Sequence, residues 1–358
     1  MTAPLPISFQ AFEAPPPIGP VPGGPGEFRR LWEATLGKGA AHDGRTLRSG
    51  TLKRPFGSGL SGNTRGALWM LGASLTFTIM TSLIKLLGDD YPAPLQAFYR
   101  QAAGLLILTP FILRRGVSVF YTTRPLMVLS RSVMAVSGIT LTFYAFQKMP
   151  LAEANALSFT RSLWVTILAA VVMREHVGPL RIGAVTVGFA GVLVMLAHSM
   201  GGENAVGLPA LAMLAAAFLL AFSVAGMKIL TQDHSPMVVL VWAAVLGAVF
   251  AIPGAVLTWR WPTWPDLALL LLMGVIGTMN QALFIRGLQV GDAAAMAPID
   301  YTRLVFAALV GFMFFNELPD AWTIVGAAII VASTLFITLW EHHVSKRAAA
   351  AQVAQGTE

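Results

Sequence analysis

Residues 160–175 read TRSLWVTILAAVVMRE, and residues 302–317 read TRLVFAALVGFMFFNE. A constant offset pairs Arg161 with Arg303 (303 − 161 = 142) and Glu175 with Glu317 (317 − 175 = 142). The same offset pairs further residues on both sides of these stretches, without a gap. Because charged residues recur at matching places within apolar runs, the two stretches indicate an internal repeat rather than a shared apolar composition.

The chain around this repeat is too apolar for a soluble protein. Hydrophobic residues make up 56% of its 358 positions and charged residues only 11%, whereas soluble domains average about 25% charged residues. Runs of about 20 apolar residues span a bilayer as helices, which satisfy their own backbone polar groups. We therefore predict an all-α membrane protein with ten transmembrane helices, near residues 66–87, 94–113, 125–147, 151–173, 178–198, 207–230, 236–258, 265–287, 292–316 and 320–340.

The sequence predicts four segments. Residues 1–62 form a Pro/Gly-rich and then basic tail, which is expected to be disordered and lacks the apolar core of a signal peptide. Residues 64–198 and 206–340 form two five-helix repeats, and residues 341–358 form a C-terminal tail. Lys and Arg cluster in the tails and in alternate loops, which places both termini in the cytoplasm. Five crossings per repeat is an odd number, so the second repeat is expected to be inverted relative to the first.

Two arginines are predicted to lie at the middle of the bilayer. Arg161 is about ten residues into its helix and Arg303 about eleven, which at 1.5 Å per residue is half of a ~30 Å hydrocarbon core. A charge at this depth costs at least ~2.5 kcal/mol, so such a residue is a functional hypothesis by default. Inverted-repeat transporters bind their substrates at this depth, between the repeats. We therefore predict a substrate site around Arg161 and Arg303.

Asp300 lies three residues before Arg303, on the same helical face. Two interpretations stay open: an internal ion pair that lets the helix tolerate its arginine, or a site in which Arg303 meets an anionic substrate group while Asp300 orients it or takes a proton. Further candidate substrate-binding residues, each with packing or snorkelling as the alternative, are Tyr99, Arg100, Arg131, Tyr144, Asn155, Ser158, Asn280, Gln281, Phe284 and Tyr301.

Charged residues near the helix ends receive other roles. Glu175 and Glu317 follow the two repeated stretches at opposite membrane faces, where we expect them to pin loops or gate the cavity. Lys85 lies near the end of the first helix and is expected to extend toward the headgroups. Pro298 is expected to kink its helix just before Asp300.

Several longer stretches resemble the drug/metabolite transporter superfamily, specifically its EamA-type ten-helix family. They are FYRQAAG at 98–104, FYAFQKMPLAEANAL at 143–157, and APIDYTRLVFAALVGFMFFNELPDAWTIVGAAII at 297–330. The resemblance implies a secondary transporter of a metabolite such as an amino acid, nucleoside or vitamin, with a cavity lined mainly by the third, fourth, eighth and ninth helices. The IDYTR segment is similar to the subgroup for S-adenosylmethionine or riboflavin uptake. Ser162 stands where the family often has proline, which removes the usual cause of a kink there.

The sequence argues against other classes of protein. It contains no Cys, and its His residues lie in tails, in loops or at helix ends, so no enzyme, metal site or cofactor is expected. No phosphate-binding glycine loop indicates ATP-driven transport. The net charge of +7 is assigned to membrane topology rather than to nucleic acid. We expect multi-pass insertion in a bacterial inner membrane, with lipid and a small-molecule substrate as partners. Export instead of uptake, a coupling proton or ion, a monomer or homodimer, and a channel or sensor on this fold stay open.

Overall fold

The computed structural model describes residues 62–88, 90–116, 120–171, 178–199, 207–234, 236–291 and 293–355. Glu175 and almost all of the predicted N-terminal tail lie outside these residues. The described residues form α-helices joined by short connections, with no strand among them. The helices are α2 (Gly62–Leu86), α3 (Ala93–Arg115), α4 (Pro125–Lys148), α5 (Leu151–Ser158), α6 (Thr160–Val171), α7 (Pro179–Ser199), α8 (Gly207–Asp233), α9 (Pro236–Leu257), α10 (Trp264–Val290), α11 (Ala293–Asp300), α12 (Thr302–Phe315) and α13 (Ala321–Gln355).

The all-α membrane architecture is confirmed. Within the described ranges, nine segments are long and apolar enough to cross a bilayer, with α5 and α6 forming one of them and α11 and α12 another. The helix α3 supplies a tenth segment of 23 residues, whose lower hydropathy reflects Arg100 and the paired arginines at its end. The last helix α13 continues to Gln355, so most of the predicted C-terminal tail extends this helix.

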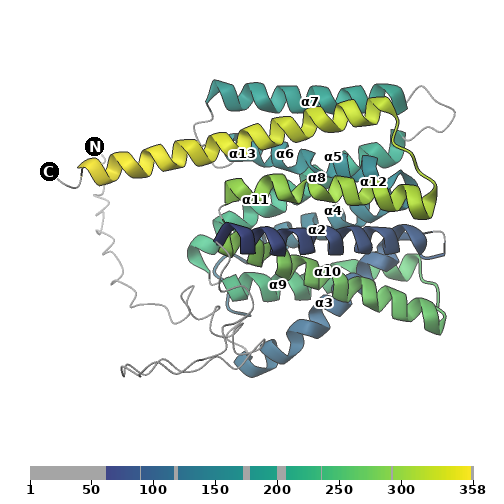
Figure 1. The fold of residues 1–358 in the computed structure, drawn as a ribbon. Helices are drawn as coiled ribbons and strands as arrows, with labels where there is room; N and C mark the ends of the chain where they lie inside the picture. Colours follow the sequence, from purple (N-terminus) through teal and green to yellow (C-terminus); the bar gives the residue numbers. More distant parts are fainter. Residues whose placement is uncertain are drawn as a thin grey trace, which may run out of the picture. The chain divides into compact units, whose positions relative to one another are not determined.

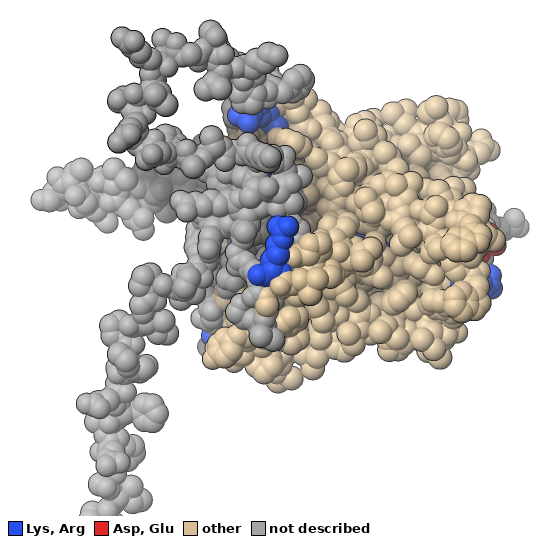
Figure 2. Space-filling model, turned by 90° about the horizontal axis from the view of Figure 1, so that it is seen from below, with Lys and Arg blue, Asp and Glu red and all other residues tan. Residues whose placement is uncertain are grey.

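Charged side chains gather at the two ends of the helices. On the face that Figure 2 shows, Lys and Arg lie at both ends and Asp and Glu at one, with a band of uncharged residues between them. Many large apolar side chains are exposed along the helices, including Leu106, Leu193 and Phe312. In water such a surface would mark an interaction site. In a membrane protein it is the surface that contacts lipid.

Helices of the two repeats pack against each other in matching pairs. The helix α10 packs on α2 as α4 packs on α8, while α3 packs on α9 and α7 on α13. Figure 1 shows α7 and α13 side by side. Their contacts run in opposite order, because Ser333 of α13 donates to the carbonyl of Ala184 whereas Gly326 lies against Gly191. The two helices are therefore antiparallel.

Glycine is required where α7 and α13 approach most closely. A Cβ atom added to Gly326 would lie 2.7 Å from the carbonyl oxygen of Gly191, and one added to Gly191 would lie 2.9 Å from that of Gly326. No side chain fits at such distances. The small residues let the two backbones come together, which is how helices associate in lipid.

Both repeats contain a helix that is interrupted at the same place. The first interruption is at Phe159, between α5 and α6, and the second is at Tyr301, between α11 and α12. These residues differ by the repeat offset (301 − 159 = 142). At each interruption the backbone forms a hydrogen bond between residues that are three positions apart. Ser162 N donates to Phe159 O, and Leu304 N donates to Tyr301 O, both at 3.0 Å.

Hydroxyl side chains accompany these interruptions. Thr160 donates to the carbonyl of Leu157 at 2.7 Å, and Thr302 donates to that of Ile299 at 2.6 Å. Side chains that bond to backbone carbonyls compete with regular helical bonds and bend helices. The first interruption forms without a proline, so Pro298 is not the feature common to both. Although Ser162 stands where the family often has proline, this helix is still interrupted.

Candidate functional site at the helix interruptions

The two interruptions lie next to each other. The rings of Phe159 and Tyr301 meet edge to face with centroids 4.6 Å apart. Arg303 donates from Nη2 to Oγ of Ser158 at 3.1 Å. Since α5 also packs along α12, with Gly311 beside Leu151, the first half of one interrupted helix runs alongside the second half of the other, in the opposite direction.

Arg303 is buried among aromatic rings. Only 8% of the residue is exposed, and its guanidinium carbon lies 3.8 Å from the ring centroid of Phe159 and 4.9 Å from that of Phe77. A cation over an aromatic face is stabilised by about 2 kcal/mol when desolvated. Its Nε atom has no hydrogen-bond partner among the described residues. The rings and one hydroxyl therefore hold this arginine in a fixed position.

Arg161 has different surroundings. Its side chain is exposed, and it interacts electrostatically with Arg303 and Asp300. No ion pair within 4.0 Å joins Asp300 to Arg303 in the described part of the chain. Asp300 nevertheless interacts electrostatically with Arg303. Two guanidinium groups and one carboxylate leave an excess positive charge here.

The neighbouring polar residues hold the backbone of the site. Ser158 donates to the carbonyl of Asn155 at 2.7 Å, and Asn155 donates from Nδ2 to that of Leu151 at 2.8 Å. The buried Oδ1 of Asn155 has no partner within the described ranges. Tyr301 bonds through its hydroxyl to Oγ1 of Thr334 at 2.6 Å, which connects the second interruption to α13. These bonds fix the positions of both interruptions.

Other predicted site residues lie elsewhere. Tyr99 stacks on Trp259, with ring centroids 6.3 Å apart. Arg100 donates to Gln101 at 2.9 Å and approaches Gly277 of α10. Asn280 donates to the carbonyl of Ala73 at 2.7 Å and so joins α10 to α2.

Three further predicted residues are on α4 and α10. Tyr144 and Phe284 are half-buried, and Gln281 is exposed. Tyr144 packs against the main apolar core. None of the three forms a hydrogen bond with Arg161 or Arg303 within the described residues.

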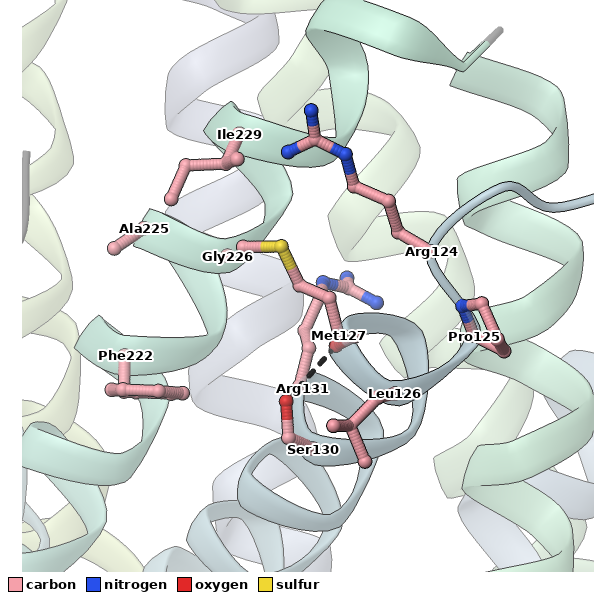
Figure 3. Close-up of a pocket in the computed structure, with 10 residues that line it drawn as sticks. All are labelled: Arg124, Pro125, Leu126, Met127, Ser130, Arg131, Phe222, Ala225, Gly226 and Ile229. Carbon is pink, nitrogen blue, oxygen red and sulfur yellow. Dashed lines mark hydrogen bonds between the residues drawn. The ribbon is translucent and has the colours of Figure 1, made fainter. Parts of the chain in front are cut away.

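Arg131 lines a separate pocket. Figure 3 shows it between the first turns of α4 and the last turns of α8, in a hollow of about 420 Å³. Neither Arg161 nor Arg303 lines this hollow. These two arginines, which the repeat offset pairs, lie at the helix interruptions. We therefore treat the interruptions as the candidate site.

At one end, the interrupted helices are joined by an ion pair and hydrogen bonds, and we call this the closed end. Glu317 forms an ion pair with Lys85 and also accepts from the backbone N–H of Leu151 at 2.9 Å. Lys85 donates to the carbonyl of Met149 at 2.8 Å as well, so it pairs inside the protein instead of extending to the headgroups. Asn316 adopts a left-handed conformation that ends α12 and turns Glu317 back toward α5.

More bonds strengthen this end. In the connection between α2 and α3, Tyr91 donates to Asp266 at 2.8 Å, and its carbonyl accepts from Gln147 at 3.2 Å. Burial, and then the bond to Asp266, raise the pKa of Tyr91, so its hydroxyl stays protonated. At the opposite end, α6 and α11 are the repeat equivalents of α12 and α5, and they make at most marginal contact in the described ranges. The two ends therefore differ.

Sequence reasoning missed the two rings that enclose Arg303. Phe159 is the repeat equivalent of Tyr301 (301 − 159 = 142), so the repeat alignment that identified the arginines could have identified it too. Phe77 comes from α2, far away in the sequence, and nothing in its local pattern distinguishes it from a packing residue.

Comparisons with known proteins agree with these features. The EamA-like transporter family matches residues 64–197 and again 207–339. The S-adenosylmethionine uptake transporter of Rickettsia prowazekii is 30% identical over 276 residues, covering 76% of this chain and 92% of the relative. The riboflavin transporter of Vibrio cholerae is 31% identical over 288 residues, covering 79% and 96%.

Further relatives include an exporter and a solved structure. The pseudopaline exporter of Pseudomonas aeruginosa is 28% identical over 284 residues, covering 76% of this chain and 95% of the relative. A solved crystal structure shares the fold with a TM-score of 0.54 at 18% identity, covering 78% of this chain and 98% of that one. The relatives are transporters of small metabolites, not enzymes. With both of its repeats matched, the chain belongs to the EamA-like transporter family, within the drug/metabolite transporter superfamily.

Proposed function

We propose that this protein is a secondary transporter that moves a small metabolite across a bacterial inner membrane by alternating access. Its substrate site lies at the two helix interruptions, where Arg161 and Asp300 meet the solute and Arg303 shapes the site. The observation that carries this proposal is the convergence of three charged residues from two interrupted helices, at positions that the internal repeat relates.

The packing supports inverted repeats. The antiparallel order of α7 and α13 is what inversion requires. The contact between Phe159 and its own equivalent Tyr301 is also expected, because a residue meets its equivalent only near the axis that relates two units. Two similar units can exchange conformations, so a cavity between them opens to either side in turn.

The difference between the two ends of the interrupted helices is what we expect of a transporter that is closed to one side of the membrane. The ion pair of Lys85 and Glu317 joins the helices at the end where α5 begins, whereas α6 and α11 make at most marginal contact with each other at the other end within the described ranges. Described basic residues at helix ends, such as Arg65, Arg124 and Arg286, lie at the end opposite the ion pair, which we propose is cytoplasmic. With this orientation the end that the ion pair holds together faces away from the cytoplasm, and both termini lie on the cytoplasmic side.

The excess positive charge suits a solute with an anionic group. A carboxylate or phosphate would neutralise it, so anionic or zwitterionic metabolites and vitamin- or nucleoside-like solutes are the substrate classes to test. The names of the relatives add S-adenosylmethionine and riboflavin, and they include both uptake and export. Direction is therefore a result to be measured.

The test has two stages. A thermal-shift screen of the purified protein against a metabolite panel identifies a ligand, and exchange of that labelled ligand in proteoliposomes measures transport. We expect Arg161→Ala and Arg303→Ala to abolish exchange while the protein stays folded in the membrane, and Arg260→Ala, in an exposed loop, to leave it unchanged. Normal exchange by either of the first two variants would refute the proposed site. Flux without saturation would indicate a channel, and ligand binding without any flux would indicate a sensor.

A further inference from the structure

The pocket between α4 and α8 is separate from the proposed substrate site. Figure 3 shows Arg131 pointing into it from α4, toward the end at which Arg124 lies, with Phe222 and Ile229 of α8 across from them. The wall is mostly apolar. Leu126 at its edge is 77% exposed, so the pocket opens at the lipid-facing surface.

Arg131 is buried in this pocket without a matching anion in the described part of the chain. The residue is 8% exposed, and its Nε atom has no hydrogen-bond partner among the described residues. Its Nη2 atom donates to the sulfur of Met227 at 3.7 Å, and a thioether is a weak acceptor. A buried charge is costly unless it is paired. The geometry therefore leaves a cation that is turned toward an unfilled space.

In the other repeat, apolar packing occupies the equivalent place. The residue equivalent to Arg131 is Met273 (131 + 142 = 273), and the residue equivalent to Gly226 is Ile84 (226 − 142 = 84). Met273 and Ile84 are fully buried in the main apolar core. The pocket and Arg131 between α4 and α8 therefore stand where α10 and α2 have ordinary apolar packing.

The position of Arg131 matches that of a lipid headgroup. It follows Pro125, the first residue of α4, by six positions, or ~9 Å along the helix. Helical side chains point back toward the N-terminus, so its guanidinium reaches toward the membrane face at which α4 begins. Lys and Arg near helix ends commonly extend toward this level.

We propose that this pocket binds an anionic phospholipid from the leaflet at that face, which our orientation makes the cytoplasmic leaflet. The headgroup phosphate lies between Arg131 and Arg124, and an acyl chain lies along Leu126 and Phe222. Basic pockets between transmembrane helices on the cytoplasmic side bind anionic headgroups. A soluble phosphate would need the arginines but not the apolar wall, and the wall favours the lipid.

The test compares lipids on the purified full-length protein. We expect phosphatidylglycerol to be retained in native mass spectra and to raise the melting temperature more than phosphatidylcholine with the same acyl chains. Arg131→Met, which installs the residue of the other repeat, should weaken retention about fivefold, the effect of one arginine near an anionic surface. Gly226→Leu should do the same by filling the pocket while the arginines remain. A Cβ atom there meets Arg131 at an ordinary 3.5 Å.

Two controls distinguish a bound lipid from a general effect of surface charge and from free phosphate. Arg65→Met removes an exposed charge at the same face and should leave retention unchanged. Inorganic phosphate at millimolar concentration should not displace the lipid. The proposal is overturned if both pocket variants retain phosphatidylglycerol as the wild type does, if Arg65→Met weakens retention equally, or if phosphate alone reproduces the stabilisation. If Arg131→Met does not fold, Gly226→Leu decides the question.

Discussion

The interruptions at Phe159 and Tyr301 have the same backbone but different surroundings. Each is followed two residues later by an arginine, yet Arg303 is enclosed by rings and a serine hydroxyl, whereas Arg161 is exposed near Asp300. Internal repetition therefore conserves where a charge is placed without fixing what the charge does. One guanidinium is held by aromatic rings and a hydroxyl, and its equivalent is exposed, as our proposed substrate site requires.

The largest expected effect comes from replacing each arginine by lysine. Lysine keeps the charge but cannot stack as a flat guanidinium does. We expect Arg303→Lys to lower the initial rate of exchange about thirtyfold, equivalent to the ~2 kcal/mol of a desolvated cation–π contact. Arg161→Lys should lower it by less than about tenfold, since an exposed ammonium still attracts an anion. Equal losses in the two variants would contradict the division of roles.

This division could not have been predicted from the sequence. Depth along a helix predicted the two arginines as a pair, because depth depends only on counting residues. The enclosure of Arg303 depends on Phe77, which a different helix brings near. Likewise Tyr99 was a candidate for the site, but its ring packs on Trp259, and no local pattern distinguishes packing from ligand contact.

The fold was more predictable than the site. The ten membrane-spanning segments follow from runs of apolar residues, and the repeat follows from one offset. The interruption at Phe159 was not predicted, because proline, the usual cause of a kink, is absent there. The hydroxyl groups of Thr160 and Ser162 were the available signal, since both bond to backbone carbonyls at this place.

The second prediction concerns the end that Glu317 closes. Glu317→Gln removes the charge opposite Lys85, which is largely buried, so we expect the free energy of unfolding to fall by about 1.5 kcal/mol. The apparent melting temperature in detergent measures this change. Asp320→Asn is a matched control: it removes one charge from the same loop, and asparagine can still cap the N–H of Thr323. A loss in the control as large as that in Glu317→Gln would mean that the ion pair has no special role.

The third prediction compares the two ends directly. The chain contains no cysteine, so single cysteines can be labelled without background. Gln147 is half-buried and bonds to Tyr91 at the closed end, whereas its equivalent Gln289 is exposed at the other. We expect a cysteine at 289 to react with a soluble maleimide on the order of tenfold faster than one at 147, since the less exposed thiol reacts mainly after local opening.

Ligand should change this ratio if the ends exchange during transport. A substrate that populates the opposite state would protect position 289 and expose position 147. Equal labelling of the two positions without substrate would contradict the unequal closure of the ends.

The smallest expected effect is at the contact between the interruptions. The hydroxyl groups of Tyr301 and Thr334 share a hydrogen bond of 2.6 Å in which either oxygen can donate, and replacing Tyr301 by phenylalanine removes it. Tyr301→Phe should therefore lower the free energy of unfolding by about 1 kcal/mol, measured as a lower melting temperature.

The reverse exchange is the control. The residue equivalent to Thr334 is Val192 (334 − 142 = 192), whose side chain offers no acceptor. Phe159→Tyr should thus also destabilise the protein, by leaving a buried hydroxyl unpaired. If Phe159→Tyr were instead stabilising, the first interruption would have a polar neighbour that the repeat comparison does not reveal, and the contrast between the two interruptions would be weaker than we infer.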